Sequence, residues 1–304
     1  YFRPHGDITE GAYTVAIFRV TGADGFAPTR PAATFSDWLL GTAGDPLNLK
    51  VGYDQCSGGR MRLSAGKGNG LVDGAMDITL REWNMNGTCP FETRSYAESW
   101  LRDEGFPLEE YDLQIYVLPS ELAWKSVYAF ASGRSSAYKD RLAQYYNLIM
   151  HEVGHSLGLG HSGQRFGSYE YTYNDHTGLM GCPGFGNDWP AMCFNAAKSW
   201  YLGWYSERHL ELNVGADGSR EVDLVGIDDH LYGSQLEAHH ITLLKLSGTG
   251  ERDIYLTFNR AKGINREVRE YPDHVTLIEA DGTAAGRSML LKGLTPTPVK
   301  SWER

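Results

Sequence analysis

The chain has 304 residues, a hydrophobic fraction of 41% and a formal net charge of -10. This size predicts one large or two modest globular domains, and an acidic balance without any Lys/Arg run argues against nucleic acid or an anionic membrane as a partner. No apolar run approaches the ~18–20 residues of a membrane span, and because the chain starts at Tyr1 rather than Met, we expect that preceding segments have been removed.

Strand-like and helix-like segments alternate through the first half of the chain. From β-branched, aromatic and alternating residues we expect strands at Tyr13–Val20, Leu47–Tyr53, Met76–Leu80, Leu113–Val117 and Val127–Ala131. Helices are expected at Ala33–Leu40, from a Thr93 cap to Gly105, and from about Ser136 to Leu157. This order predicts an α/β sandwich, with the last helix under a twisted sheet and a cleft along that helix.

The end of the last predicted helix carries the most informative stretch, His-Glu-Val-Gly-His-Ser-Leu-Gly-Leu-Gly-His from His151 to His161. At ~100° per residue, His151, Glu152 and His155 share one side of the helix, and side chains at i and i+4 are roughly 5–6 Å apart. Gly158 stands where a helix commonly ends in a left-handed residue, so the chain can turn and return His161 to the same ion.

Three imidazoles and a water make an open tetrahedral zinc site. Glu152, one residue past the first ligand, is placed to act as general base on that water. A lone histidine is more often solvated, or buried with its ring nitrogens hydrogen-bonded. However, no packing requirement demands three His, a Glu and a Gly at this spacing. We therefore predict a Zn²⁺ cofactor held by His151, His155 and His161.

Periodicity is absent between Gly163 and Pro190, which predicts an irregular subdomain. Four cysteines without a C-x-x-C pair favour two disulfides over a second zinc site, and disulfides indicate a secreted protein. We expect Cys182 to pair with Cys193 and Cys56 with Cys89, although four cysteines allow three connectivities.

The C-terminal third has a different pattern of apolar and polar residues. After a short predicted helix at Asn195–Leu202, short alternating segments are separated by turn signals such as Ala-Asp-Gly. The strand candidates are Val222–Leu224, Ile241–Leu243, Ile254–Phe258, Val275–Leu277 and Met289–Leu291. They predict an all-β, sandwich-like domain at residues 206–304, after a catalytic domain at residues 1–205.

The zinc stretch resembles the signature of the metzincin metalloproteases, in which a Met turn underlies the metal. Met180, in Gly-Leu-Met-Gly, stands where that turn is expected, whereas Met150 lies inside the helix and Met192 beyond the turn region. The position two residues after Met180, where some metzincins place a Tyr ligand, holds Cys182. The tyrosines nearby are more readily explained as packing or pocket lining; they are Tyr169, Tyr171 and Tyr173.

More narrowly, several motifs together resemble the gametolysin (autolysin) family of secreted zinc endopeptidases, known for dissolving the glycoprotein walls of algae. Beside the zinc stretch these are Ala16-Ile-Phe-Arg-Val, Tyr53-Asp-Gln-Cys-Ser-Gly-Gly, Gly70-Leu-Val-Asp, Leu179-Met-Gly-Cys, Cys193-Phe-Asn-Ala and Trp200-Tyr-Leu-Gly-Trp. The resemblance covers roughly the first two thirds of the chain. It implies a metzincin-like catalytic domain, the zinc, base and Met-turn roles given above, and an inhibitory propeptide that has been removed.

Together these observations predict a secreted zinc-dependent endopeptidase acting on extracellular or cell-wall and matrix (glyco)proteins. The extended substrate is expected at the strand edge near Val127–Ser132. His176, close to the expected Met turn, is a candidate for substrate or oxyanion contact, although a turn-capping role is the simpler interpretation.

The alternative is a zinc-bearing matrix- or glycan-binding protein with little turnover, which the intact Glu152 argues against. In either case the C-terminal domain is a candidate for glycan or matrix contact, and a structural spacer is the simpler interpretation. The aromatic and imidazole candidates for that contact are Tyr232, His239, His240 and Tyr255. A second metal at His239 and His240 is not expected, because adjacent strand residues point to opposite faces.

Overall fold

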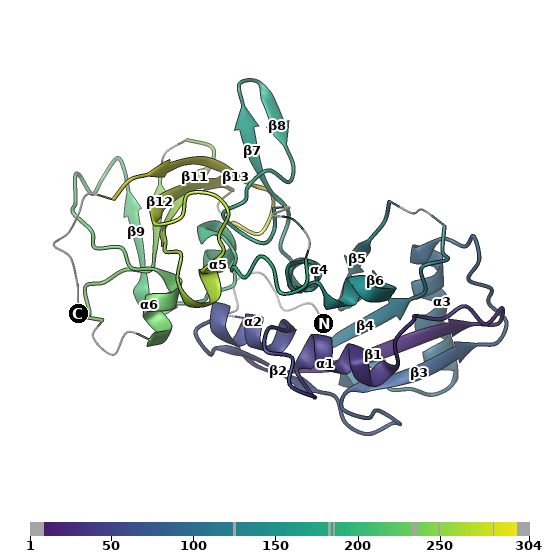
Figure 1. Ribbon diagram of the computed structural model, residues 1–304. Coiled ribbons are helices and arrows are strands. Elements are labelled where there is room, and N and C mark those ends of the chain that lie inside the picture. The colour runs from purple at the N-terminus through teal and green to yellow at the C-terminus, as the bar shows by residue number, and fades with distance from the viewer. Residues whose placement is uncertain are drawn as a thin grey trace.

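The molecule contains two β-sheets at opposite ends, with helix α4 (Tyr146–Ser156) between them (Figure 1). The computed structural model describes residues 9–123, 126–181, 184, 186–232, 236–248, 250–281 and 283–296. The helices formed by these residues are all too short or too polar to span a bilayer.

The first sheet has six strands in the order β2-β1-β4-β6-β5, with β3 also paired to β1. Every pairing in it is parallel except that of the edge strand β5 with β6. The strands are β1 (Gly11–Gly22), β2 (Met61–Ala65), β3 (Ala75–Leu80), β4 (Leu113–Leu118), β5 (Ala129–Ser132) and β6 (Ser135–Lys139). The predicted mixed α/β domain is confirmed.

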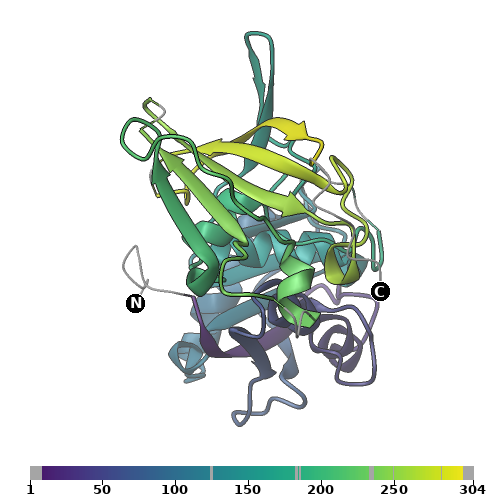
Figure 2. The same cartoon turned by 90° about the vertical axis from the view of Figure 1, so that its left-hand side faces the viewer.

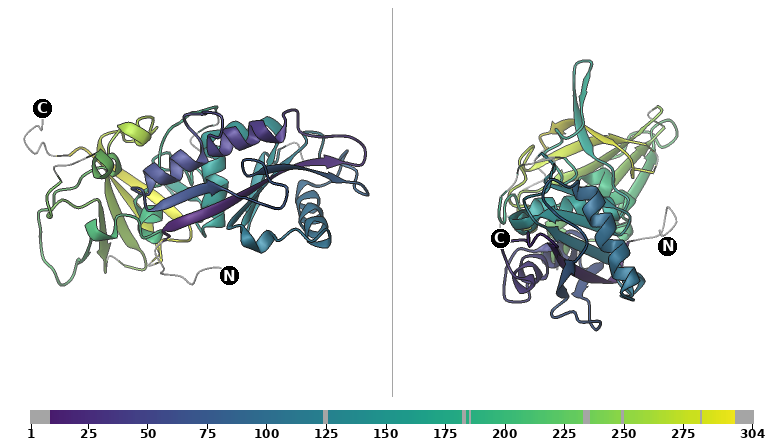
Figure 3. Two further views of the ribbon diagram at one scale, coloured as in Figure 1. Left: turned by 90° about the horizontal axis from the view of Figure 1, so that it is seen from below. Right: turned by 90° about the vertical axis from the view of Figure 1, so that its right-hand side faces the viewer.

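Helices cover both faces of this sheet, which explains why β1 reads as a continuous apolar run. Val15 and Ile17 point into the core beneath α1 (Ala32–Leu40), α2 (Leu49–Cys56) and α4. The alternate residues of β1 point into a second core beneath α3 (Pro90–Asp103). The left view of Figure 3 shows α1 and α2 on one side of the sheet and α3 on the other.

The predicted strand at Leu47–Tyr53 is wrong, because this segment folds as α2. The side chain of Asn48 caps the helix by accepting a hydrogen bond from the Val51 N–H at 3.0 Å. Leu49, Gly52, Tyr53 and Cys56 are buried at helical spacing. A short apolar run is compatible with either state, so the cap was the signal that decided it.

The helix predicted from Ser136 to Leu157 is about twice as long as the helix that forms, α4, which has 11 residues. Its first residues form β6, which fills the place between β4 and β5, and a 3-10 turn at Asp140–Gln144 precedes α4. The expected cap of α3 is also misplaced. That helix begins at Pro90, and Thr93 lies buried inside it, where its hydroxyl accepts a hydrogen bond from the Trp83 indole at 3.1 Å.

The second sheet has seven strands in the order β8-β7-β13-β12-β11-β10-β9 and is mostly antiparallel (Figure 2). Its strands are β7 (Ser162–Phe166), β8 (Tyr169–Tyr171), β9 (His209–Asn213), β10 (Leu243–Ser247), β11 (Asp253–Asn259), β12 (His274–Ala280) and β13 (Ser288–Leu294). The hairpin β7–β8 comes from the segment expected to be irregular. It projects beyond the rest of the sheet (Figures 1 and 2).

The sandwich prediction is wrong, since the described residues place these strands in one sheet. Helix α5 (Ala196–Tyr201), which the Asn195 side chain caps as expected, packs against β11 and β12 in place of a facing sheet. The predicted strand at Val222–Leu224 is reduced to a bridge between Leu224 and Ile241, and α6 (Ile227–Tyr232) adds a helix to a region expected to have none.

A single apolar core connects the two sheets. It contains Ile17 of the first sheet, Ile149 of α4, Met180, and Tyr255 and Leu290 of the second sheet. The second sheet therefore packs onto the helix that carries the zinc motif.

The disulfide joins Cys56 at the end of α2 to Cys193, so both predicted pairings are wrong. The two cysteines are 137 residues apart in sequence, with their Cα atoms 5.5 Å apart. Cys89 carries a free thiol before α3, which covers the other face of the first sheet. Cys182 lies outside the described residues. The predicted pairs joined cysteines that are close in sequence. In the structure, α2 packs beside the segment that contains Cys193, which brings Cys56 to Cys193 instead.

Replacing Cys56 with Ser should lower the free energy of unfolding by about 2–4 kcal/mol, because the bond closes a long loop. Urea denaturation measures this change, with Cys89→Ser as the matched control, expected to stay within about 0.5 kcal/mol of wild type. Peptide mapping without reduction should recover a Cys56–Cys193 peptide. A Cys56–Cys89 peptide in its place would contradict the structure.

Candidate metal centre

Helix α4 supplies the first two histidines of the motif. It ends at Ser156, and Gly158 has φ +91°, a left-handed conformation that glycine adopts at low cost. The Leu159 N–H donates to the Gly154 carbonyl across this turn at 3.0 Å. The chain then reverses toward the helix and brings His161 back, as the position of Gly158 predicted.

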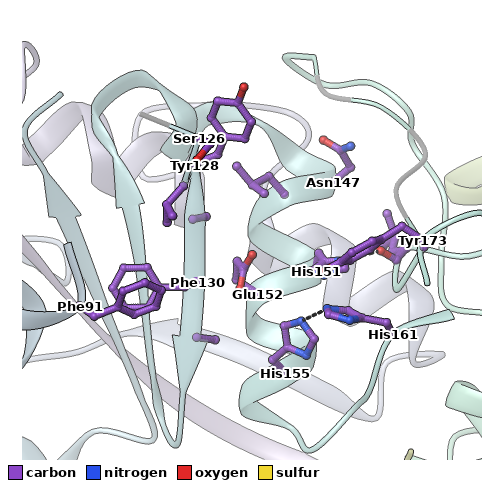
Figure 4. Close-up of a pocket in the computed structure, with 16 residues that line it drawn as sticks. Phe91, Ser126, Tyr128, Phe130, Asn147, His151, Glu152, His155, His161 and Tyr173 are labelled. Carbon is purple, nitrogen blue, oxygen red and sulfur yellow. Dashed lines mark hydrogen bonds between the residues drawn. The ribbon is translucent and has the colours of Figure 1, made fainter. Parts of the chain in front are cut away.

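The three imidazoles converge. One ring nitrogen of each of His151, His155 and His161 lies within 4.8 Å of the other two, and the Nε2 atoms of His155 and His161 are 3.0 Å apart (Figure 4). Lone pairs of unprotonated imidazoles this close repel one another unless a proton or a cation lies between them. The donor set is the one that zinc takes in catalytic sites with three protein ligands.

Two backbone carbonyls fix the orientation of the α4 imidazoles. Nδ1 of His151 lies 2.7 Å from the Leu179 carbonyl, and Nδ1 of His155 lies 2.7 Å from the Leu159 carbonyl. Since a carbonyl only accepts, the proton belongs on Nδ1 and the lone pair on Nε2. Burial lowers the pKa of His151 to about 3 and that of His161 to about 4, which also favours neutral rings. The residues present therefore fit zinc.

Glu152 lies beside the histidines, only 7% exposed, in the wall of the same cavity. Burial raises the pKa of its carboxyl to about 7. A carboxyl with a pKa near neutrality can both take and return a proton at physiological pH. Figure 4 shows it on the side of α4 that faces β5.

Met180 packs against helix α4 at Gly154 and is fully buried. A Cβ at Gly154 would come within 2.7 Å of its sulfur, so the glycine permits this close contact. The Met180 carbonyl also accepts a hydrogen bond from the Ser162 N–H, next to His161, at 2.8 Å. This placement supports the Met-turn role that the resemblance implied.

The turn before β13 holds the third histidine in place. The Gly160 N–H donates to the Ala285 carbonyl at 2.7 Å, and the Ser288 N–H donates to the His161 carbonyl at 3.1 Å. Immediately afterwards Ser162 pairs with Ser288 as β7 joins β13. The backbone on both sides of His161 is thus bonded to the C-terminal part of the chain.

Lys198 of α5 secures that turn from the inside. It is fully buried, and its ammonium donates to the carbonyls of Ala284, Ala285 and Gly286. Burial lowers the pKa of this amine, while the nearby Asp281 and Asp175 oppose that effect. Three carbonyls match the three N–H donors of an ammonium group.

The zinc motif opens into a cavity of about 580 Å³ between α4 and the edge strand β5 (Figure 4). Its walls are largely apolar. Besides the histidines and Glu152, the lining includes Phe91, Val127, Tyr128, Phe130, Asn147, Leu148, Tyr173 and Leu179. This volume is within the usual range for a small-ligand or side-chain pocket.

Of two further candidate site residues, Tyr173 lies at the cavity and His176 does not line it. Tyr173 lines the cavity, and its ring centroid lies 4.2 Å from that of His161, whereas His176 is not among the described residues of the lining. The His176 N–H donates to Glu270 at 3.3 Å. The oxyanion role considered for His176 therefore gains no support from the structure.

Asn147, one turn before His151 and 2% exposed, lines the cavity although no sequence motif indicated it. Its Oδ1 and Nδ2 atoms are buried without a hydrogen-bond partner, which costs about 1–3 kcal/mol for such a group. A polar residue one turn before the motif was the available signal, but no sequence pattern marks it as functional.

The strand geometry expected for His239 and His240 is wrong. The two residues lie in a turn, not a strand, and with Asp223 they form a second cluster with ligand atoms within 4.8 Å. However, the carboxylates of Asp223 and Glu237 already lie near the His239 ring nitrogens, and the Glu237 N–H donates to Nδ1 of His240 at 3.0 Å. These polar atoms have partners, so the cluster does not require a metal.

The comparison with family models agrees with the motif. A family model described as Gametolysin peptidase M11 matches residues 13–225, more than half of the chain. No curated protein matches significantly. Among solved structures, wild type OgpA from Akkermansia muciniphila in P 41 21 2 has 12% identity and a TM-score of 0.41, over 95% of both chains. The P 21 21 21 form has 11% identity and a TM-score of 0.41, over 95% of this chain and 94% of that chain.

Zinc-loaded protein should retain about one zinc per chain after dialysis, because three neutral imidazoles already converge. Elemental analysis measures this ratio. His155→Ala should lose most of the zinc, whereas the double variant His239→Ala/His240→Ala should keep the wild-type ratio. Full zinc retention by His155→Ala would contradict the assignment.

Lys198→Met should lower the free energy of unfolding by about 2 kcal/mol or more, because three carbonyls lose a charged donor. It should also accelerate zinc loss to a chelator, because the turn that holds His161 loosens. Lys292→Met, at an exposed position on β13, is the matched control. Equal zinc-loss rates in the two variants would show that Lys198 does not support the site.

Proposed function

The chain belongs to the gametolysin peptidase M11 family of metalloendopeptidases, and on this premise we propose that it is a secreted zinc endopeptidase acting on extracellular or cell-wall and matrix (glyco)proteins. The observation that carries the proposal is the convergence of three imidazoles, two of them oriented by backbone carbonyls, and of Glu152 on one cavity. A binding protein without turnover would have no need for a buried carboxyl at that position.

In the proposed reaction His151, His155 and His161 would hold the metal through Nε2. Zinc bound there would supply Lewis acidity for the scissile carbonyl and for a water molecule. Glu152 takes the proton of the attacking water and returns it to the leaving nitrogen. The raised pKa of Glu152 suits both transfers. The carbonyls of Leu179 and Leu159 keep the two α4 rings oriented throughout.

The edge strand β5 is the proposed docking place for the extended substrate. β5 pairs with β6 at the end of the strand order, and Val127, Tyr128 and Phe130 line the cavity beside it. A substrate backbone can extend the sheet at such an edge through main-chain hydrogen bonds, while pockets select alternate side chains. The position agrees with the edge expected from the sequence.

We further propose that the protein is secreted and that the two parts of the chain have different roles. The Cys56–Cys193 disulfide supports an oxidising compartment. We assign catalysis to residues 1–205, with a fold of metzincin type. Residues 206–304 are assigned to support and to contact with glycan or matrix, and an inhibitory propeptide is proposed to precede the mature enzyme.

Glu152→Gln should lower peptidase activity by at least ~100-fold, because the amide cannot accept the proton of the water. Zinc content should stay at the wild-type level, since Glu152 is not a proposed ligand. The measurement is mass spectrometry of new peptide termini after incubation with a mixed extracellular protein pool.

Wild type should generate new termini that disappear with a zinc chelator and are absent with Glu152→Gln. Equal termini from both proteins would refute the role of Glu152. An absence of termini from fully zinc-loaded wild type would instead favour the binding-protein alternative.

A further inference from the structure

A polar group lies unpaired in the wall of the cavity. Asn147 is on α4, one helical turn before His151, and lines the same cavity as the zinc motif. Its side chain is almost completely buried, and neither Oδ1 nor Nδ2 has a hydrogen-bond partner. Figure 4 shows it at the N-terminal end of α4, above His151.

The local structure gives no reason for an amide at this position. The N-terminal end of α4 has no side-chain capping bond, so Asn147 does not serve as a cap. Other lining residues of the cavity, such as Leu148, Val127 and Leu179, are apolar. An apolar residue would fill the same place without an unpaired donor and acceptor, and buried polar groups are normally paired.

The chemistry of the carboxamide restricts what can pair with it. Nδ2 donates and Oδ1 accepts, so a second carboxamide satisfies both atoms at once. A carboxylate pairs only with Nδ2 and places its charge close to Oδ1, while an ammonium pairs only with Oδ1. An aliphatic side chain leaves both atoms unpaired.

We propose that this part of the cavity is a side-chain subsite for Asn or Gln, recognised by the carboxamide of Asn147. The inference rests on the proposed peptidase function and specifies its substrate class. Asn147 is a specificity residue, because it contacts the substrate side chain beside the metal and takes no part in bond cleavage. The unpaired amide of the free enzyme becomes paired only when the matching substrate is bound.

The first test compares peptides that are identical except at the residues flanking the scissile bond, where Gln, Asn, Leu or Glu is placed. Wild type should prefer Gln or Asn to Leu at one of these positions by at least ~10-fold in kcat/KM, since a site with buried polar groups rejects an analogue that leaves them unpaired. Asn147→Leu should abolish or reverse this preference. The same Gln:Leu ratio in both proteins overturns the proposal.

Two controls separate recognition from packing. Leu148→Met changes an apolar lining residue of similar volume and should leave the Gln:Leu ratio within about twofold of wild type. Asn147→Leu should retain zinc and melt no lower than wild type, because it removes an unpaired buried amide. If Asn147→Leu does not fold, Asn147→Met takes its place, with the same expected loss or reversal of the preference.

A binding measurement distinguishes failure of the subsite from failure of the proposed function. Zinc-loaded Glu152→Gln should bind the Gln peptide at least ~10-fold more tightly than the Leu peptide, and the double variant with Asn147→Leu should lose this difference. Preferential binding without cleavage by wild type would leave the subsite standing and refute the peptidase function. Equal affinities for both peptides overturn the subsite.

Discussion

The structure depends on one constraint, which is that three imidazoles from two segments must meet at a single point with their Nε2 lone pairs inward. Helix α4 places two of them without further help, because i and i+4 side chains share a face. The third requires the turn at Gly158 and a fixed path for the following residues. That path is held by the turn before β13, so the second sheet helps to build the centre.

Function places polar groups where folding alone would not. Glu152 and Asn147 are buried beside apolar residues, and the three histidines are partly desolvated in the same cavity. Each of these groups reduces stability relative to an apolar core. The shared core, which packs both sheets against α4, and the Cys56–Cys193 bond, which joins α2 to the segment before α5, offset this cost. Such local departures from good packing are typical of functional sites.

The sequence predicted those features that depend on neighbours along the chain. His151, Glu152 and His155 converge through helical spacing, and Gly158 turns the chain, so the centre was predictable. The disulfide, strand β6, the hairpin β7–β8 and the Lys198 contacts depend on partners far away in sequence, and no local pattern encodes them. Asn147 was missed because its importance is that it has no partner, which only the packed structure can reveal.

The most direct test of the account is X-ray absorption spectroscopy at the zinc edge of the loaded protein. A centre of three histidines predicts nitrogen and oxygen neighbours at about 2.0–2.1 Å, an imidazole scattering pattern that fits three rings, and no sulfur shell. His161→Ala should reduce the imidazole contribution by about a third or release the metal. A sulfur shell at about 2.3 Å, or an unchanged spectrum for His161→Ala, would contradict the three-histidine centre.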